Sequence, residues 1–267
     1  MPWEAGETRH PEPDPLPADP PSADVLTLER AALTAVPAPR LAWDGGFVLR
    51  GFLNGTGRAN AACSLDPSPD PGLEARLDRM EADFARMGLP VRFRSTPLDP
   101  PGLKPALLAR GYVEHEGACV MAGPLRPLAE AAGAGVELLD SPAEDWLSVL
   151  ATAEYQTEAR RAEKAGGGAM LARPGRWLLR REDGLPAACA HVVADAALCG
   201  IFDVATDPRF RRRGLAQRVL AAGAAWAAGL GATTAWLQVS PSNTGARDLY
   251  ARLGLVEVYR YTYFLRG

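Results

Sequence analysis

The chain has 267 residues, of which 47% are hydrophobic, and a formal net charge of −3. A chain of this length forms one large domain or two ordinary ones, and its hydrophobic fraction is sufficient for a buried core. The weak negative charge creates no overall basic field, so no nucleic-acid partner is expected. No run of about 18 apolar residues occurs, so neither a membrane span nor a membrane partner is expected.

The first 23 residues are rich in proline, and we expect them to form a disordered tail. They lack the basic start and apolar middle of a secretory signal, so a cytoplasmic location is expected. The four cysteines have no C-x-x-C spacing, and the three histidines lie far apart in the sequence. The sequence therefore predicts free thiols and no metal site.

From Asp24 onwards the pattern is that of a folded α/β unit. Apolar residues at helical spacing predict a short helix at 25–33, and a clean amphipathic helix is predicted at 73–87, ending at Gly88. Strands are expected at 47–52, 59–65, 91–95 and 112–123, with a short helix at 103–110. Residues 24–123 are therefore interpreted as one domain, and the Pro-, Ala- and Gly-containing stretch 124–135 as a linker.

The second predicted domain spans residues 136–267. It opens with a strand at 136–140 and a helix for which Ser141 is the expected N-cap. Three successive strands are predicted at 176–181, 187–193 and 197–206. A helix at 214–229, a strand at 234–239, a helix at 243–253 and a strand at 256–265 complete the chain.

The two halves resemble each other. Residues 88–123 and 231–266 both show a glycine, a strand, a proline, a short helix, a second glycine and an aromatic strand. The offset between them is about 143 residues, which favours two tandem copies of one unit over coincidence.

The segment from Gly200 to Ala216 combines an apolar strand, a short basic loop and the start of a helix. Three arginines precede Gly214, whose missing side chain lets a ligand approach the backbone closely. The free N–H groups of a first helical turn attract anions. The pattern indicates a pyrophosphate-binding loop, with a solvated basic turn as the alternative.

Together with the rest of the chain up to its C-terminus, this segment resembles the GNAT superfamily of N-acetyltransferases. The shared pattern is R-x-x-G-x-A after a strand, then a helix, a strand, and Asn243, Ala246, Tyr250 and Gly254 at the expected spacing. The resemblance covers residues 136–267. It implies an α/β (α+β) fold with a mixed, mostly antiparallel central sheet flanked by helices, and acetyl-CoA as cosubstrate.

The resemblance also implies which residues bind the cosubstrate. Val204 and Thr206 lie on the strand that pairs with the pantetheine arm, and the Val204 N–H polarises the thioester carbonyl. Asn243 either hydrogen-bonds the pantetheine region or is an ordinary helix N-cap. The CoA pyrophosphate is assigned to the backbone of Arg211, Arg212, Arg213, Gly214, Leu215 and Ala216.

Two residues are candidates for the chemistry. Tyr250 corresponds to the tyrosine that protonates the departing thiolate, and its alternative is a core side chain. Asp203 is a candidate general base beside the thioester, or a solvated strand residue. Glu154 and Tyr155 lie where the family lines its acceptor pocket, and His191 is interpreted as structural.

The first half departs from the family where the phosphate loop is expected. Residues 64–72 carry Asp66 and Asp70, three prolines and no arginine. Carboxylates repel a pyrophosphate, and proline offers no N–H donor. We therefore expect a degenerate GNAT-like copy that does not bind CoA, in a two-copy plan similar to that of mycothiol synthase.

The expected activity is transfer of acetyl from acetyl-CoA to a primary amine of a small molecule or amino acid by direct attack. The N-terminal copy is expected to shape the acceptor pocket, so that a monomer is sufficient. The alternatives are a CoA-binding sensor without catalysis, and an acyltransferase that uses a longer acyl-CoA. The acceptor itself is not named by the sequence.

Overall fold

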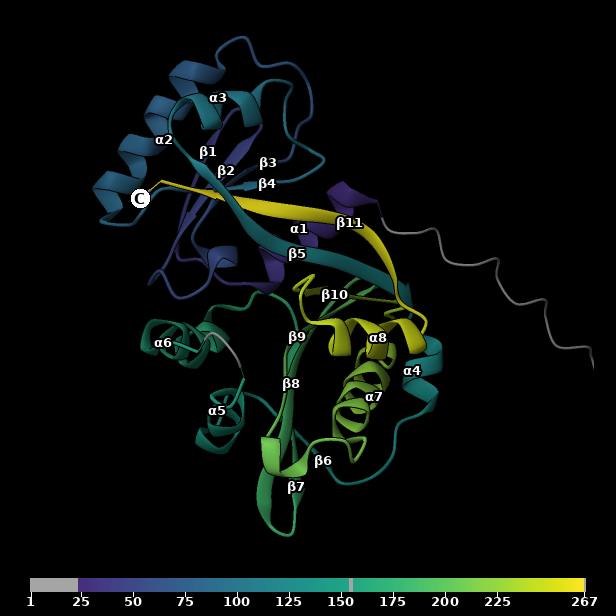
Figure 1. The fold of residues 1–267 in the computed structure, drawn as a ribbon. Helices are drawn as coiled ribbons and strands as arrows, with labels where there is room; N and C mark the ends of the chain where they lie inside the picture. The colour runs from purple at the N-terminus through teal and green to yellow at the C-terminus, as the bar shows by residue number, and fades with distance from the viewer. Residues whose placement is uncertain (1–23, 154–155, 267) are drawn as a thin grey trace, which may run out of the picture.

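One sheet of eleven strands runs through the part of the chain that the computed structural model describes, residues 24–153 and 156–266 (Figure 1). The predicted tail over residues 1–23 lies outside this part. The strands are β1 (Arg40–Asp44), β2 (Phe47–Gly51), β3 (Ala62–Ser64), β4 (Arg92–Ser95), β5 (Val113–Pro124), β6 (Val136–Leu139), β7 (Gly175–Glu182), β8 (Leu185–Asp195), β9 (Leu198–Thr206), β10 (Thr234–Val239) and β11 (Val256–Leu265). The α-helices are α1 (Val25–Ala35), α2 (Leu73–Met87), α3 (Leu103–Ala109), α4 (Arg126–Glu130), α5 (Glu144–Leu150), α6 (Glu158–Gly167), α7 (Leu215–Ala228) and α8 (Thr244–Arg252).

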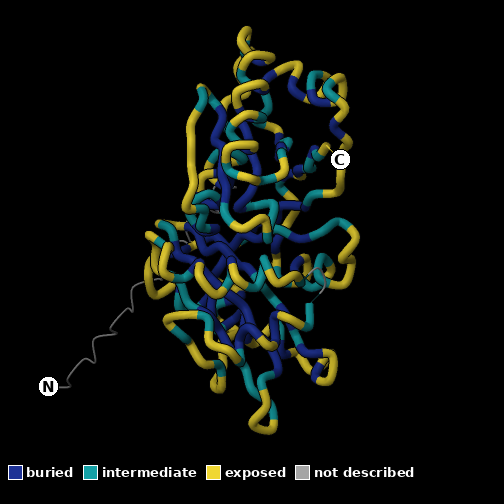
Figure 2. The backbone as a smooth tube through the Cα atoms, turned by 90° about the vertical axis from the view of Figure 1, so that its left-hand side faces the viewer, coloured by how far each residue is buried: buried dark blue, intermediate teal, exposed yellow. Residues whose placement is uncertain are grey.

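The strand order is β1-β2-β3-β4-β11-β5-β10-β9-β8-β7-β6. Only the pairs β3–β4 and β9–β10 are parallel among the described strands, and the others are antiparallel. The predicted mixed, mostly antiparallel sheet flanked by helices is therefore confirmed. Buried backbone follows the middle strands, while the surrounding loops are exposed (Figure 2).

The two halves exchange a strand at the centre of this sheet. β5, from the first half, lies between β10 and β11 of the second half, and β11 in turn lies between β4 and β5. The motifs β4-α3-β5 and β10-α8-β11 follow the predicted repeat closely. The halves thus form one continuous sheet, and their division into two GNAT copies at 24–123 and 136–267 stays a prediction.

Helices cover both faces of the C-terminal part of the sheet. α7, with α4 and α8 beside it, packs on one face over a core that includes Ile201, Leu220 and Leu237. α5 covers the other face over Trp177, Leu179 and Cys189. α1 of the first half packs on Phe202 and Trp236 of the second, so the halves also share a core.

Three local predictions differ from the structure. α5 begins at Glu144 with Ala143 as its N-cap, and no side chain caps it, so the prediction for Ser141 was wrong. The stretch expected to be a linker contains α4, which is held by the buried Leu128. Strand β1 was not predicted, because its exposed residues lack the alternation of a half-buried strand.

Candidate active site

An opening lies between two neighbouring parallel strands. The pairing of β9 with β10 ends at Ile201 and Leu237, although β9 continues to Thr206 and β10 to Val239. Within the described residues, Phe202 to Thr206 therefore have no strand partner on the β10 side. Free N–H and C=O groups of this kind can pair with an extended ligand, as an added strand would.

A β-bulge lies on β9 at this opening. Cys189 pairs with Ala205 and His191 with Phe202, so Asp203 and Val204 together face the single residue Ala190. Asp203 has φ +54°, a left-handed conformation that aspartate adopts more readily than most residues. Its side chain is 1% exposed although the residue as a whole is half-buried. The accessible atoms of Asp203 therefore belong to its backbone.

The loop after β9 forms a cradle of free N–H groups. Within the described residues, no backbone N–H from Arg211 to Gln217 donates a hydrogen bond. Arg212 at φ +62° and Gly214 at φ +73° turn the chain into α7 through two left-handed positions. Such a turn at the N-terminus of a helix attracts anions. The loop is exposed from Arg211 to Gly214, and Leu215 anchors the helix in the core.

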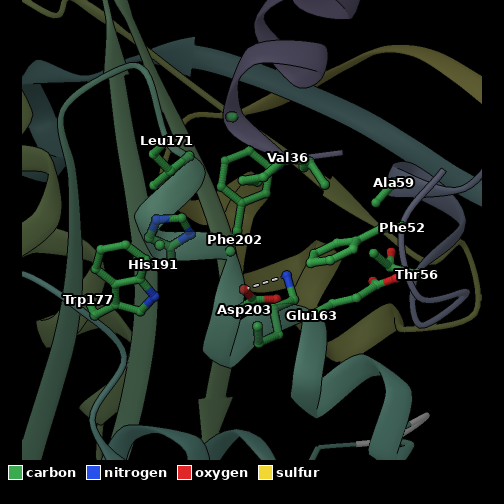
Figure 3. A pocket seen from close by; sticks show the side chains of 15 residues that line it. Val36, Phe52, Thr56, Ala59, Glu163, Leu171, Trp177, His191, Phe202 and Asp203 are labelled. Carbon is green, nitrogen blue, oxygen red and sulfur yellow. Dashed lines mark ion pairs between the residues drawn. The ribbon is translucent and has the colours of Figure 1, made fainter. Parts of the chain in front are cut away.

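A pocket lies on the other side of the sheet from α7, and both halves of the chain line it (Figure 3). Phe202 and Asp203 contribute from β9, and Glu163 and Lys164 from α6. The first half contributes Val36 and the loop after β2. Apolar and aromatic walls are supplied by Val36, Phe52, Leu171, Trp177 and Phe202.

The floor of this pocket holds a buried ion pair. Lys164 Nζ lies 2.7 Å from Asp203 Oδ2, with the two side chains 13% and 1% exposed. Burial raises the pKa of Asp203, but the attraction of Lys164 and Arg58 outweighs it and lowers this pKa to about 2. Burial lowers the pKa of Lys164, which Asp203 partly offsets. A carboxylate with so low a pKa is a weak proton acceptor, so Asp203 is poorly suited to be the general base.

His191 lies beside this pair and is neutral. Its ring stacks on Trp177 with centroids 4.4 Å apart, and burial lowers its pKa to about 3. Its Nε2 is buried and has no hydrogen-bond partner in the described part of the chain. The interpretation of His191 as a structural side chain fits its stacking, although it also lines the pocket.

The remaining predicted residues lie on the α7 side. Tyr250 is 7% exposed and packs in the core of that face, and its hydroxyl makes no hydrogen bond to any described residue. Burial raises the pKa of Tyr250 to about 12, so the phenol is neutral and able to donate a proton. Asn243 is the N-cap of α8, where its Oδ1 accepts the Ala246 N–H at 3.1 Å. Glu154 and Tyr155 lie outside the described residues.

The corresponding loop of the first half carries its own carboxylate. Asp70 Oδ1 accepts the Gly72 N–H at 3.0 Å, and Asp70 Oδ2 lies 2.6 Å from Arg76 Nε. The start of α2 is therefore occupied by an internal anion, whereas the start of α7 has free donors. The absence of CoA binding in the first half remains a prediction, and this geometry supports it.

Most residues that line the pocket were not predicted from the sequence, among them Glu163, Lys164 and Trp177. The first two lie on α6, in a region with no clear apolar periodicity. The sequence did contain a signal for the start of α6, because Thr157 caps this helix by accepting the Arg160 N–H at 3.2 Å and the acidic Glu158 follows it.

Within the described residues, no group of His, Cys, Asp and Glu side chains could hold a metal ion. The described helices are all too short or too polar to span a membrane.

The fold is similar to that of GNAT-type acetyltransferases of known structure. The GCN5-related N-acetyltransferase from Kribbella flavida has a TM-score of 0.66 at 22% identity, over 92% of this chain and 97% of that one. A tandem GNAT protein from the clavulanic acid biosynthesis pathway has a TM-score of 0.61 at 13% identity, over 92% of this chain and 89% of that one. At these identities the similarity shows the fold alone.

The family follows from the sequence comparison. Residues 22–264 match the family described as "Probable histone acetyltransferase Rv0428c C-terminal", and the chain belongs to this family. A comparison with curated proteins found no match.

Proposed function

We propose that the chain is an acetyl-CoA-dependent N-acetyltransferase that acetylates a primary amine of a small molecule or amino acid by direct attack. The observation that carries this proposal is the open edge of β9 at the Asp203 bulge, with the free N–H groups of Arg211 to Gln217 at its end. A pyrophosphate fits the cradle, and an extended pantetheine arm fits the unpaired edge from Val204 to Thr206.

The residues at the opening suit a direct transfer. Attack of an amine on a thioester carbonyl develops an oxyanion, which we expect the Val204 N–H to stabilise. The departing thiolate needs a proton, and Tyr250 supplies a neutral hydroxyl on the α7 side of the sheet. Cations near the pocket lower the pKa of an acceptor ammonium, which then loses its proton to water before attack. No protein base is required in this scheme.

Acetyl is favoured over a longer acyl group by the packing around the opening. Phe202 and Trp236 pack edge to face with centroids 5.4 Å apart and are 3% and 1% exposed. A side chain on Gly200 would contact both rings, so this region of the sheet is already full.

Calorimetric titration of the purified protein with acetyl-CoA tests the proposal. We expect one site per chain, and saturation at about 100 times the Kd stabilises the fold by roughly 2.7 kcal/mol. Release of free CoA thiol in the presence of amines then separates an enzyme from a binding module. No binding at millimolar acetyl-CoA, or binding without any turnover, contradicts an acetyltransferase.

The first half supplies one wall of the pocket, so we propose that a monomer is sufficient for activity. Light scattering combined with gel filtration measures the mass in solution. An obligate dimer, with activity that falls on dilution, contradicts this part of the proposal.

A further inference from the structure

Three cationic side chains lie at or near the acceptor pocket: Lys164 lines it, and Arg58 and Arg160 lie close to Asp203 in its lining. Among the described residues, only Lys164 has a carboxylate partner. Lys164 pairs with Asp203. The Arg58 guanidinium carbon lies 5.7 Å from the centre of the Phe202 ring, and its side chain makes no hydrogen bond or ion pair to a described residue. The Arg160 side chain has no such partner either, and its Nε is fully buried. Arg58 and Arg160 are both half-buried.

The described carboxylates nearby form no ion pair with these arginines, although Asp203 attracts both of them through space. Asp203 forms its ion pair with Lys164. Glu163 is held by hydrogen bonds to the first half: its Oε1 accepts the backbone N–H groups of Leu53 at 3.1 Å and Gly55 at 2.7 Å. The same oxygen accepts the side-chain amide of Asn60 at 2.8 Å. Among the described residues, Arg58, Arg160 and Lys164 thus outnumber Asp203 and Glu163 by one charge. Partial burial makes an uncompensated charge costly, so cations in such places are normally paired. An anionic group of a ligand would balance this excess.

The pocket walls limit the rest of the ligand. Phe52, Leu171, Trp177 and Phe202 present apolar surface to the pocket, and Arg58 lies over the Phe202 ring. A ligand that fits has an anionic group near the arginines and an apolar body against these side chains. A lysine in a basic peptide fits poorly, since its neighbours would add positive charge to the same cluster.

We propose that the acceptor is a small apolar amino acid, whose carboxylate is held by Arg58 and Arg160 while its amino group faces the opening at Val204. Arginine suits this task because its planar fork binds a carboxylate through two parallel hydrogen bonds. The inference rests on the proposed N-acetyltransferase function and names the class of its acceptor.

The test compares amines that differ only in the anionic group. Purified protein with saturating acetyl-CoA is given L-leucine, L-methionine or L-phenylalanine, each beside its carboxamide, and a lysine-rich peptide. Free CoA thiol and the mass of the product are measured. We expect kcat/KM to be at least tenfold higher for one of the acids than for its amide or for the peptide. The amide has the lower amine pKa, so this bias works against the expected result.

Variants locate the effect on the arginines. Arg58→Gln is expected to lower kcat/KM for the acid at least tenfold, mainly through KM, and to lower that for the amide far less. Arg252→Gln changes an exposed arginine on α8, on the other face of the sheet, and is expected to alter neither. Equal turnover of acid and amide, preference for the peptide, or an equal loss for both substrates in Arg58→Gln overturns the proposal.

A binding measurement separates this inference from the proposed function. If no amine is acetylated, calorimetry of the CoA-saturated protein compares N-acetyl-L-leucine with its amide, and likewise for methionine and phenylalanine. Tighter binding of an acid that Arg58→Gln abolishes supports the carboxylate site even though catalysis has failed. Equal binding, or none, overturns the site itself.

Discussion

The Lys164–Asp203 pair gives the sharpest prediction about stability. At 2.7 Å and an effective dielectric of about 20, the attraction between the two charges is about 6 kcal/mol. Removing each ion from water costs several kcal/mol, so the intact pair is close to neutral overall. Lys164→Met leaves the Asp203 carboxylate buried and alone, and we expect a loss of about 3–5 kcal/mol in the free energy of unfolding.

Urea unfolding, followed by tryptophan fluorescence, measures this loss. The second variant is Asp203→Asn, because asparagine tolerates the left-handed φ of +54° at the bulge. The double variant Lys164→Met with Asp203→Asn carries no lone buried charge, so it should be more stable than the sum of the two losses predicts. Arg126→Gln breaks an exposed pair with Glu130 and serves as the control, with no resolvable change expected. A loss below about 1 kcal/mol for Lys164→Met, with additive effects in the double variant, would refute the reasoning.

Three further predictions concern the chemistry, the cradle and the response to pH. Tyr250→Phe removes the proposed proton donor and is expected to lower kcat about a hundredfold or more while calorimetry shows unchanged acetyl-CoA affinity; an unchanged kcat assigns Tyr250 to the core alone. Gly214→Val places a β-branched residue at φ +73°, a conformation that costs it about 1–2 kcal/mol, so the loop should relax in the free protein. Restoring the cradle on binding should then raise the Kd for acetyl-CoA about tenfold, and an unchanged Kd argues against a cradle there. Burial holds the pKa of His191 near 3 in the folded protein, against about 6.5 when unfolded. The unfolded state therefore takes up a proton first, and the free energy of unfolding falls by up to about 1.4 kcal/mol per unit as pH drops from 6.5 towards 3. His191→Phe should flatten this slope in urea titrations at several pH values, and an identical slope contradicts a neutral buried imidazole.

The cradle could be predicted from the sequence because its signals are local. The arginines, Gly214 and the apolar residues of α7 lie within a few positions of one another, and their order alone indicates strand, loop and helix. The internal repeat could also be predicted from the sequence, since both copies of its strand-helix-strand unit lie at the predicted residues. In each case the residues that determine the structure are neighbours in the chain.

The exchange of β5 and β11 could not be predicted in the same way. Both strands are apolar and carry a suitable pattern, and nothing in that pattern says which strand lies beside which. The pairing of Val120 with Tyr259 joins residues far apart in the sequence, and only the packing of both halves selects it. The sequence pattern also left Asp203 as a strand residue, because its left-handed backbone depends on the mismatch with β8.

The ion pair and the arginines show why the proposed acceptor site is harder to infer from the sequence than the proposed cosubstrate site. Asp203 is on β9, Lys164 is on α6 and Arg58 follows β2, so three elements from both halves meet at one point. Glu163 holds α6 against the first half, because its Oε1 accepts backbone N–H groups of the 53–55 loop. A side chain on Gly55 would lie 2.6 Å from the Arg160 backbone, which indicates how closely the two segments approach. The first half therefore contributes a wall and a charge to the pocket as well as a central strand to the sheet. This explains how a copy whose own phosphate loop is occupied by Asp70 can still be required for the activity we propose.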